Sequence, residues 1–214
     1  MIKLSKTSKL DGILSWSLQA IDTCQGSRAD DGGLVPACQG CYATTGFYQF
    51  APAKNARAFN KEDWQRAEWI QEMVSALGNS RFFRWFDSGD MYDVNLANKI
   101  LAVMIHTPWV SHWLPTRMHK FKKYQHVLKL MQELPNVVVR YSSDSVTGEI
   151  IQGTNTSTIF SDQVPTGAVE CQAYQHEGKC NGCRSCYDKT VPVIAYKAHG
   201  VKMAKVIKIM AVKS

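Results

Sequence analysis

Short apolar segments alternate with amphipathic helical segments through the middle of the chain. Strands are expected at residues 81–87, 110–116 and 137–143, so their first residues lie 29 and then 27 positions apart. Between them, apolar residues recur at helical spacing. Intervals of this length accommodate a crossover helix between two parallel strands. The pattern therefore predicts an α/β fold built on a parallel sheet.

The flanking segments extend this pattern less regularly. Residues 13–21 are expected to form a first strand that leads into a long loop. A helix is expected to begin at Asn60 and to run to Leu77, before Gly78. Beyond Thr147, short apolar runs at 158–160, 169–174 and 191–196 indicate strands and loops without an intervening helix. This segment either closes the same sheet or forms a small appendage.

Length and composition favour one domain. The chain has 214 residues, of which 45% are hydrophobic and 20% charged, enough apolar surface for a core. We expect a single α/β domain over 1–214, with βα units at about 10–150 and a cysteine-bearing segment at about 151–214. No apolar run approaches a membrane span, and the first 14 residues lack a signal-peptide core. A cytoplasmic location without membrane contact is therefore expected.

Seven cysteines occur in two tight groups. In the cytoplasm thiols stay reduced, and an odd number cannot pair completely, so metal ligation explains them better than disulfides. The second cysteine group has gaps of eight, two and two residues, and consists of Cys171, Cys180, Cys183 and Cys186. Consecutive C-x-x-C steps are more typical of a cubane iron-sulfur cluster than of a zinc site, although zinc also accepts four thiolates.

The first cysteine group consists of Cys24, Cys38 and Cys41, with thirteen residues between its first two members. Three ligands on a cubane would leave one iron open to a substrate or cofactor, just as catalytic zinc sites keep one position free. Alternatively, Cys24 is a buried apolar residue and only the other two bind metal. The group follows the first expected strand, where ligands bind in parallel α/β folds.

Polar residues follow the other expected strands and should collect at the same edge of the sheet. Ser88, Gly89 and Asp90 follow the second strand, where glycine permits close approach of a ligand and the carboxylate can hold an ammonium group or a ribose hydroxyl. Arg117 can clamp a carboxylate or form an ordinary salt bridge. Ser142 ends the fourth strand. We predict that these five residues bind a small-molecule cofactor, while an ordinary capped turn is the alternative.

The charge of the chain is weaker evidence about function than the cysteines are. A formal net charge of +7 is compatible with a nucleic-acid partner. The basic residues are scattered, however, apart from Lys120, Lys122 and Lys123 and a final stretch from Lys202 to Lys213. These lysines are equally well explained as solvated faces.

Four motifs give the chain a resemblance to the phage gene-product-88 family over nearly its whole length. They are Cys38-Gln-Gly-Cys-Tyr-Ala, Phe86-Asp-Ser-Gly-Asp90, Cys180-Asn-Gly-Cys-Arg-Ser-Cys186 and Ala195-Tyr-Lys-Ala-His199. The resemblance implies a phage origin, a location in the cytoplasm of the infected host cell and an iron-sulfur content. It supplies no reaction.

The layout is also distantly similar to radical S-adenosylmethionine enzymes, in which a partial (β/α) barrel carries three cysteines after its first strand. This resemblance implies that the first cysteine group holds a [4Fe-4S] cluster whose open iron binds S-adenosylmethionine. Ser88, Gly89 and Asp90 would stand where that superfamily's Gly-Gly-Glu segment meets the methionine amine. The superfamily's C-x3-C-x2-C is replaced here by a thirteen-residue gap and C-x2-C.

The leading hypothesis is thus a phage iron-sulfur protein of radical S-adenosylmethionine-like fold, with one or two [4Fe-4S] clusters and a capacity for reductive cleavage of S-adenosylmethionine. No catalytic residue is assigned. The alternatives are a non-catalytic electron-transfer or structural cluster protein and a zinc-stabilised nucleic-acid-binding protein.

Overall fold

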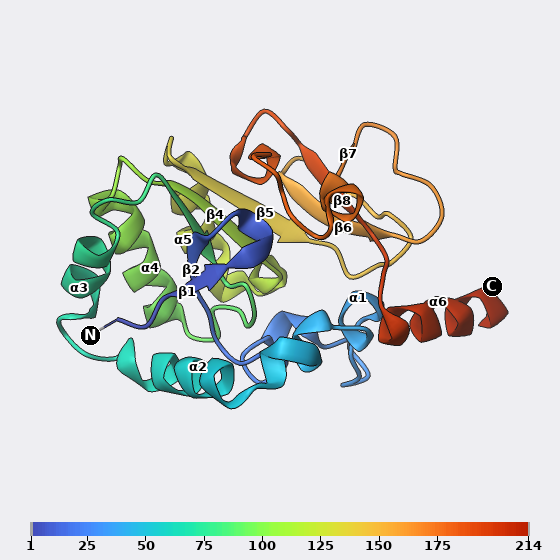
Figure 1. Ribbon diagram of the computed structural model, residues 1–214, viewed down its shortest axis with the longest axis horizontal. Helices are drawn as coiled ribbons and strands as arrows, with labels where there is room; N and C mark the ends of the chain where they lie inside the picture. The colour runs from blue at the N-terminus through green and yellow to red at the C-terminus, as the bar shows by residue number, and fades with distance from the viewer. Residues whose placement is uncertain (1, 214) are drawn as a thin grey trace.

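The computed structural model describes residues 2–213, and the side chains of residues 2–210. Its central element is an eight-stranded sheet with the strand order β1-β2-β3-β4-β5-β6-β8-β7 (Figure 1). The strands are β1 (Ser5–Thr7), β2 (Ile13–Trp16), β3 (Phe82–Trp85), β4 (Ser111–Thr116), β5 (Val137–Ser142), β6 (Thr156–Phe160), β7 (Val169–Glu170) and β8 (Val193–Lys197).

Helices connect the strands. The α-helices are α1 (Pro36–Gln39), α2 (Ala51–Asp63), α3 (Trp69–Ala76), α4 (Val94–His106), α5 (Lys122–Glu133) and α6 (Val201–Lys213). The single-turn 3₁₀ helices are η1 (Ser8–Leu10), η2 (Gln25–Ser27), η3 (Tyr42–Thr44), η4 (Gly46–Gln49), η5 (Met118–Lys120), η6 (Gln172–His176) and η7 (Ser185–Tyr187).

The predicted parallel α/β sheet is confirmed. All neighbouring strands from β2 to β7 in the sheet order run parallel, and only β1 pairs antiparallel with β2. The strands β6, β8 and β7 continue the sheet beyond β5, so the cysteine-bearing segment contributes three strands to it. The expected strand at 13–21 is shorter, because the chain leaves the sheet after Trp16.

One face of the sheet packs against α3, α4 and α5. Their apolar stripes bury a continuous core with inward-facing residues of β2 to β5. Tryptophans lie at its centre: the rings of Trp16 and Trp69 are 5.5 Å apart, and those of Trp16 and Trp85 are 6.2 Å apart, in edge-to-face geometry. This dry core fixes the strands, and therefore fixes the loops that leave their carboxyl ends.

The single helix expected from Asn60 to Leu77 is wrong, because the structure has two helices there. α2 ends at Asp63 and α3 begins at Trp69. Lys99 of α4 stabilises the break: its ammonium donates to the carbonyl oxygens of Trp64, Gln65 and Arg66 at 2.9, 3.3 and 2.7 Å. This contact comes from another helix, so helical periodicity alone did not reveal the break.

Between the apolar runs after Thr147 the described chain has no α-helix, as expected, but a helix that was not expected follows the last run. Gly200 adopts a left-handed backbone with φ of 86°, and α6 follows it. Met203 and Val206 of α6 pack on Ala37 and Val146, while Lys202, Lys205 and Lys208 are exposed. The lysines of α6 that the structure describes therefore form a solvated face.

The second face of the sheet is buried but polar. Paired strands place Ser15, Arg84 and Trp113 in one row of this face, opposite to the helix-packed core. Arg140 of β5 and Ser157 of β6 belong to the same face, and both are buried. The turn η7 covers this face by packing against β4 and β5.

The two edges of the sheet are linked by side-chain and backbone hydrogen bonds. Asp11, in the turn between β1 and β2, accepts hydrogen bonds from Arg184 Nη1 at 2.9 Å and from the Gly182 amide at 3.0 Å. The Cys180 amide donates to the Lys9 carbonyl at 2.7 Å. The segment after β7 therefore spans from one edge strand to the hairpin at the other.

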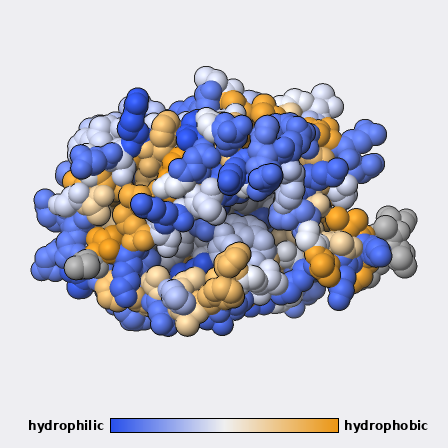
Figure 2. Space-filling view, viewed as in Figure 1, coloured by the Kyte–Doolittle hydropathy of each residue, from blue (hydrophilic) through white to orange (hydrophobic). Residues whose placement is uncertain are grey.

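The outer surface is mostly hydrophilic, with apolar patches along α2 and beside α6 in the view of Figure 2. Among the described residues, every helix is too short or too polar to cross a membrane.

Candidate metal centre

The first cysteine group lies at the carboxyl-terminal edge of the parallel sheet. Cys24 follows β2 and is held by a turn in which its carbonyl accepts from the Ser27 amide at 2.9 Å and the Ser27 hydroxyl at 2.6 Å. Cys38 is in α1 and is 8% exposed, and Cys41 follows α1 directly. All three are free thiols.

The structure brings these three thiols into one electrostatic neighbourhood. Burial raises the pKa of Cys24 to about 12, with further increments from Asp90, Cys38 and Cys41. Burial also raises the pKa of Cys38, while the nearby cations Arg117 and Lys120 oppose that rise. The cysteines that sequence spacing assigned to one site are therefore close enough to affect one another's ionisation.

A group of charged side chains surrounds this site. Arg117 Nε lies 3.2 Å from Asp144 Oδ1, and Lys120 Nζ lies 2.6 Å from Asp144 Oδ2 and 3.0 Å from the Gly26 carbonyl. Gly26 is required here, since a Cβ would come within 2.6 Å of Arg117. The two cations are thus fixed beside the loop that carries Cys24, where they favour a thiolate over a thiol.

The second cysteine group lies over the polar face of the sheet. Cys171 follows β7, and its amide donates to the Ala195 carbonyl of β8 at 2.8 Å. Cys180 and Cys183 form a tight turn, with the Cys183 amide donating to the Cys180 carbonyl at 2.9 Å, and Cys186 is in η7. Cys183 is the exposed member of the group.

Three of these thiols affect one another. Burial raises the pKa of Cys180 to about 11, with contributions from Cys171 and Cys186. Burial raises the pKa of Cys186 as well, although Tyr196, whose hydroxyl lies 3.4 Å from the Cys186 sulfur, opposes the rise. Cys171, Cys180 and Cys186 are therefore close enough to affect one another's ionisation.

No compact site for one ion is present in the part of the chain that the structure describes. There, no three His, Cys, Asp or Glu side chains are arranged so that they could hold a metal ion.

The comparison with known families matches the description Gene product 88 over residues 1–209. The chain belongs to the Gene product 88 family. This confirms the first of the two resemblances proposed from the motifs. No curated protein and no solved structure gives a match.

In this Gene product 88 chain, three residues predicted to bind a cofactor make contacts with other parts of the chain itself. They are Ser88, Gly89 and Asp90. Ser88 is buried, and its hydroxyl donates to the Leu18 carbonyl at 2.8 Å. A Cβ on Gly89, whose φ is 78°, would come within 2.6 Å of Leu18 and 2.7 Å of Thr23. Gly89 is thus required by the packing of the chain itself.

Asp90 is the most perturbed carboxylate at this edge. It accepts from the Thr116 hydroxyl at 2.9 Å, the Arg117 amide at 2.9 Å and the Met91 amide at 2.8 Å. Burial nevertheless raises the pKa of Asp90 to about 6, since these donors offset only part of the desolvation cost. Asp90 is therefore a buried acid near Cys24 that ties β3 to β4.

The remaining two predicted cofactor residues are partly accessible. Arg117 uses its guanidinium for Asp144 and for the Ser143 carbonyl, the latter at 2.7 Å, as in the salt-bridge alternative. Ser142 ends β5 on the polar face, in register with Ser157. Both lie at the carboxyl-terminal edge expected for them.

Sequence reasoning missed a partly buried network, called here the tyrosine–arginine network, made of Tyr42, Tyr48, Arg84 and Asp87. Arg84 pairs with Asp87 at 2.9 Å, and the Tyr48 hydroxyl donates to the same carboxylate at 2.7 Å. The Tyr42 hydroxyl donates to the Asp87 carbonyl at 2.7 Å. Burial alone would lower the pKa of Arg84, but Asp87 and the tyrosines raise it. The sequence signal for this network was a single arginine, Arg84, within an otherwise apolar strand.

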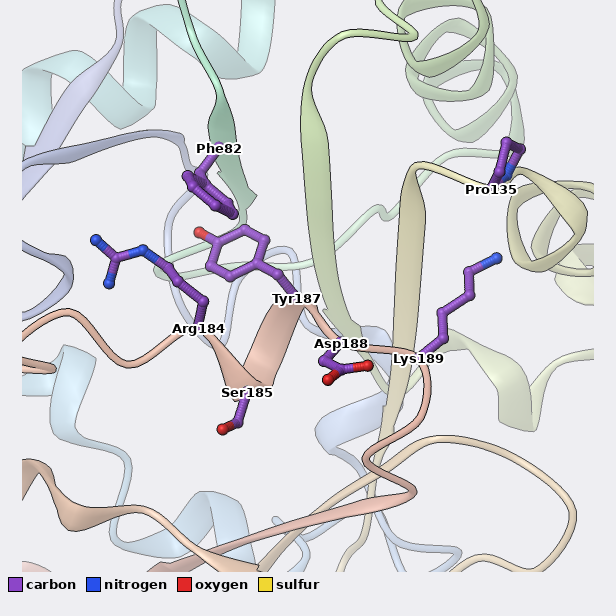
Figure 3. Close-up of a pocket in the computed structure, with 7 residues that line it drawn as sticks. All are labelled: Phe82, Pro135, Arg184, Ser185, Tyr187, Asp188 and Lys189. Atoms are coloured by element: carbon purple, nitrogen blue, oxygen red, sulfur yellow. The ribbon is translucent and has the colours of Figure 1, made fainter.

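A shallow cavity of about 560 Å³ opens where strands β3 and β5 begin (Figure 3). Its lining residues are Phe82, Pro135, Arg184, Ser185, Tyr187, Asp188 and Lys189. Phe82 and Tyr187 pack edge to face with their ring centres 5.1 Å apart. Lys189 is used by the protein, since its ammonium donates to the Gln132 and Leu134 carbonyls. This cavity is formed by the turn η7, away from the first cysteine group.

Proposed function

We propose that this chain is an iron-sulfur protein in which the first cysteine group holds a [4Fe-4S] cluster with one iron free of protein ligands. The observation that carries the proposal is that Cys38 and Cys41 lie near enough to the partly buried Cys24 to act on the ionisation of its thiol, at the carboxyl-terminal edge of a parallel sheet. Arg117 and Lys120 stand beside them, and fixed cations suit a negatively charged metal–thiolate centre. Bound there, the cluster would supply one-electron chemistry and an open iron position.

The sequence spacing of the second cysteine group favours a cluster over one ion, because its consecutive C-x-x-C steps are more typical of a cubane than of a zinc site. The second cysteine group offers four thiols and is proposed to hold a second cluster, with zinc as the alternative metal.

The strand arrangement supports a partial (β/α) barrel of the radical S-adenosylmethionine type as the finer description of the fold. Six successive parallel pairings run from β2 to β7, and Asp11 links the β1–β2 turn to Arg184 beyond the other edge. A flat sheet of eight strands would hold its edges far apart, because neighbouring strands lie about 4.8 Å from each other. The link between the edges therefore favours a curved sheet.

The proposal is tested on protein purified and reconstituted without oxygen. We expect iron and sulfide to be bound, and we expect Cys41→Ala to lose the share held by the first cysteine group. If S-adenosylmethionine is the co-substrate, reduction with dithionite releases 5'-deoxyadenosine from the native chain and none above background from Cys41→Ala. Colourless protein with zinc and without sulfide would contradict the iron-sulfur assignment.

A second candidate is a non-catalytic cluster protein that transfers electrons or supports the structure. The state of Asp90 favours it: all three described contacts of its carboxylate are to donors of the chain itself, and Gly89 is packed against Leu18. Cluster binding without any response of its paramagnetic resonance spectrum to S-adenosylmethionine would support this candidate. A spectral change on adding S-adenosylmethionine would support the catalytic one.

A further inference from the structure

Arg140 is a charged residue inside an otherwise buried strand. It is 0% exposed in β5, where it follows three buried valines. Its guanidinium donates three hydrogen bonds to backbone carbonyls in and beside the turn η7. Nε donates to the Cys186 carbonyl at 3.1 Å, and Nη2 donates to the Ser185 and Asp188 carbonyls, each at 2.9 Å. One side chain thus fixes the backbone on both sides of a cysteine.

The positive charge of Arg140 is not paired directly with a carboxylate in the part of the chain that the structure describes. Among the described residues it forms no salt bridge with Asp or Glu, and its Nη1 atom is buried without a hydrogen-bond partner. The acidic groups that act on it are Cys186, Tyr196 and Asp188. Asp188 is exposed and accepts instead from Thr190, at 2.8 Å from the amide and 2.7 Å from the hydroxyl. The partly buried acids near Arg140 are therefore a thiol, Cys186, and a phenol, Tyr196.

A buried charge without a counter-charge is unfavourable by several kcal/mol, so an arginine in this position calls for an anion. The second guanidinium on this face, Arg84, already has Asp87 as its partner at 2.9 Å. Neutral thiols in the second cysteine group would leave Arg140 unbalanced. Four thiolates on a metal centre carry more negative charge than a zinc ion or a [4Fe-4S]²⁺ core carries positive charge, so the centre is an anion.

We infer that Arg140 is a positioning residue for a metal centre on the second cysteine group, balancing the charge of the metal–thiolate centre and holding the turn that carries Cys186. This inference rests on the proposed function only in that the second group binds metal. It assigns two separable tasks to one side chain. The charge affects the energy of adding an electron to the centre, while the three carbonyl contacts affect how well the ligand loop keeps its metal.

The test uses the full chain with Cys24, Cys38 and Cys41 replaced by serine, so that only the second group holds metal. In this background, Arg140→Gln removes the charge, Arg140→Lys keeps the charge but loses most of the carbonyl contacts, and Arg57→Gln is the control. Arg57 is a matched buried arginine, 7% exposed, which donates to the Tyr48 carbonyl at 2.8 Å. Two quantities are measured: the midpoint potential by dithionite titration with paramagnetic resonance, and the rate of metal release to a chelator.

We expect Arg140→Gln to shift the midpoint potential to more negative values, because a missing positive charge makes reduction harder. Arg140→Lys should keep the potential near that of the parent chain, and both variants should release metal at least about tenfold faster, the effect typical of residues that orient metal ligands. Arg57→Gln should change neither quantity. If the second group holds zinc, no midpoint potential is measured, and the inference is tested by the rates of metal release.

The outcomes separate the two proposals. A native chain without iron and sulfide would overturn the proposed function. Metal in the second group, with potential and release rates unchanged in Arg140→Gln, would overturn the role of Arg140 and leave the proposed function standing. A potential that shifts equally in Arg140→Lys and Arg140→Gln would overturn the charge-balancing part, since a merely structural residue would act in that way.

Discussion

Protonation of His112 should destabilise the fold in mild acid. His112 is fully buried in β4, and its ring joins a chain of hydrogen bonds: Trp85 Nε1 lies 3.3 Å from Nδ1, and Nε2 lies 2.9 Å from the Thr107 hydroxyl. The Thr107 hydroxyl donates to the Val103 carbonyl at 2.7 Å, so Nε2 must carry the hydrogen and Nδ1 must accept. A proton on Nδ1 would face the tryptophan N–H and break this chain.

The size of the effect follows from the pKa of His112, which burial lowers from 6.5 to about 3. Between these values the unfolded chain binds the proton and the folded chain does not, so stability is present at neutral pH and is lost as pH falls below 6.5. At pH 5 the loss relative to pH 7.5 is about 2 kcal/mol. This figure hardly depends on how far below 5 the folded pKa lies.

The assay is urea unfolding at pH 7.5 and 5.0, with reductant and chelator present so that thiols stay reduced and metal-free. His112→Gln cannot take up this proton, so from pH 7.5 to 5.0 it should lose about 2 kcal/mol less free energy of unfolding than the native chain. His126→Gln, which replaces an exposed histidine of α5, should lose as much as the native chain. Equal losses in His112→Gln and the native chain would refute this reasoning.

Three further predictions concern the site. Because burial raises the pKa of Cys24 to about 12, anaerobic iron loading should speed up by about tenfold per pH unit between pH 6 and 8, as followed by visible absorbance; a flat profile would contradict protonated thiols. Tyr48→Phe removes a 2.7 Å bond to the carboxylate of the tyrosine–arginine network and should lower the unfolding free energy by about 1 kcal/mol in urea titrations. Gly26→Ala forces Arg117 to move, so it should lower the free energy of unfolding by about 1–3 kcal/mol and slow iron loading. Gly33→Ala is the control, because its added Cβ meets only a flexible exposed side chain. Equal effects of the two variants would argue against the role of Gly26.

The fold was predictable where local patterns agree with tertiary contacts. The strand intervals gave the parallel order of β3, β4 and β5, because a crossover helix fills each interval. The strand β1 was missed because Ser5–Thr7 is short and polar and is stabilised only by pairing with β2. The break between α2 and α3 was missed because Lys99, which caps it, lies more than thirty residues away.

The candidate site was predictable in its ligands but not in its surroundings. Spacing alone suggested the two cysteine groups, and within each group thiols affect one another's ionisation in the structure, while metal binding by either group stays a prediction. Ser88, Gly89 and Asp90 were placed correctly at the sheet edge, yet their engagement with Leu18, Thr23 and Thr116 depends on packing. Arg140 could have been noticed, because a charge after three valines in a buried strand demands a partner.

The contact between Gly40 and Met203 has a consequence for how the protein matures. A Cβ on Gly40 would come within 2.8 Å of Met203, so α6 presses directly on the turn between Cys38 and Cys41. Likewise, Cys180 is anchored to Lys9, near the beginning of the chain. A nascent polypeptide still emerging from the ribosome therefore has neither cysteine pocket complete. If the proposed function holds, iron delivery to the first cysteine group follows the synthesis of α6, so translation and metallation are separated in time.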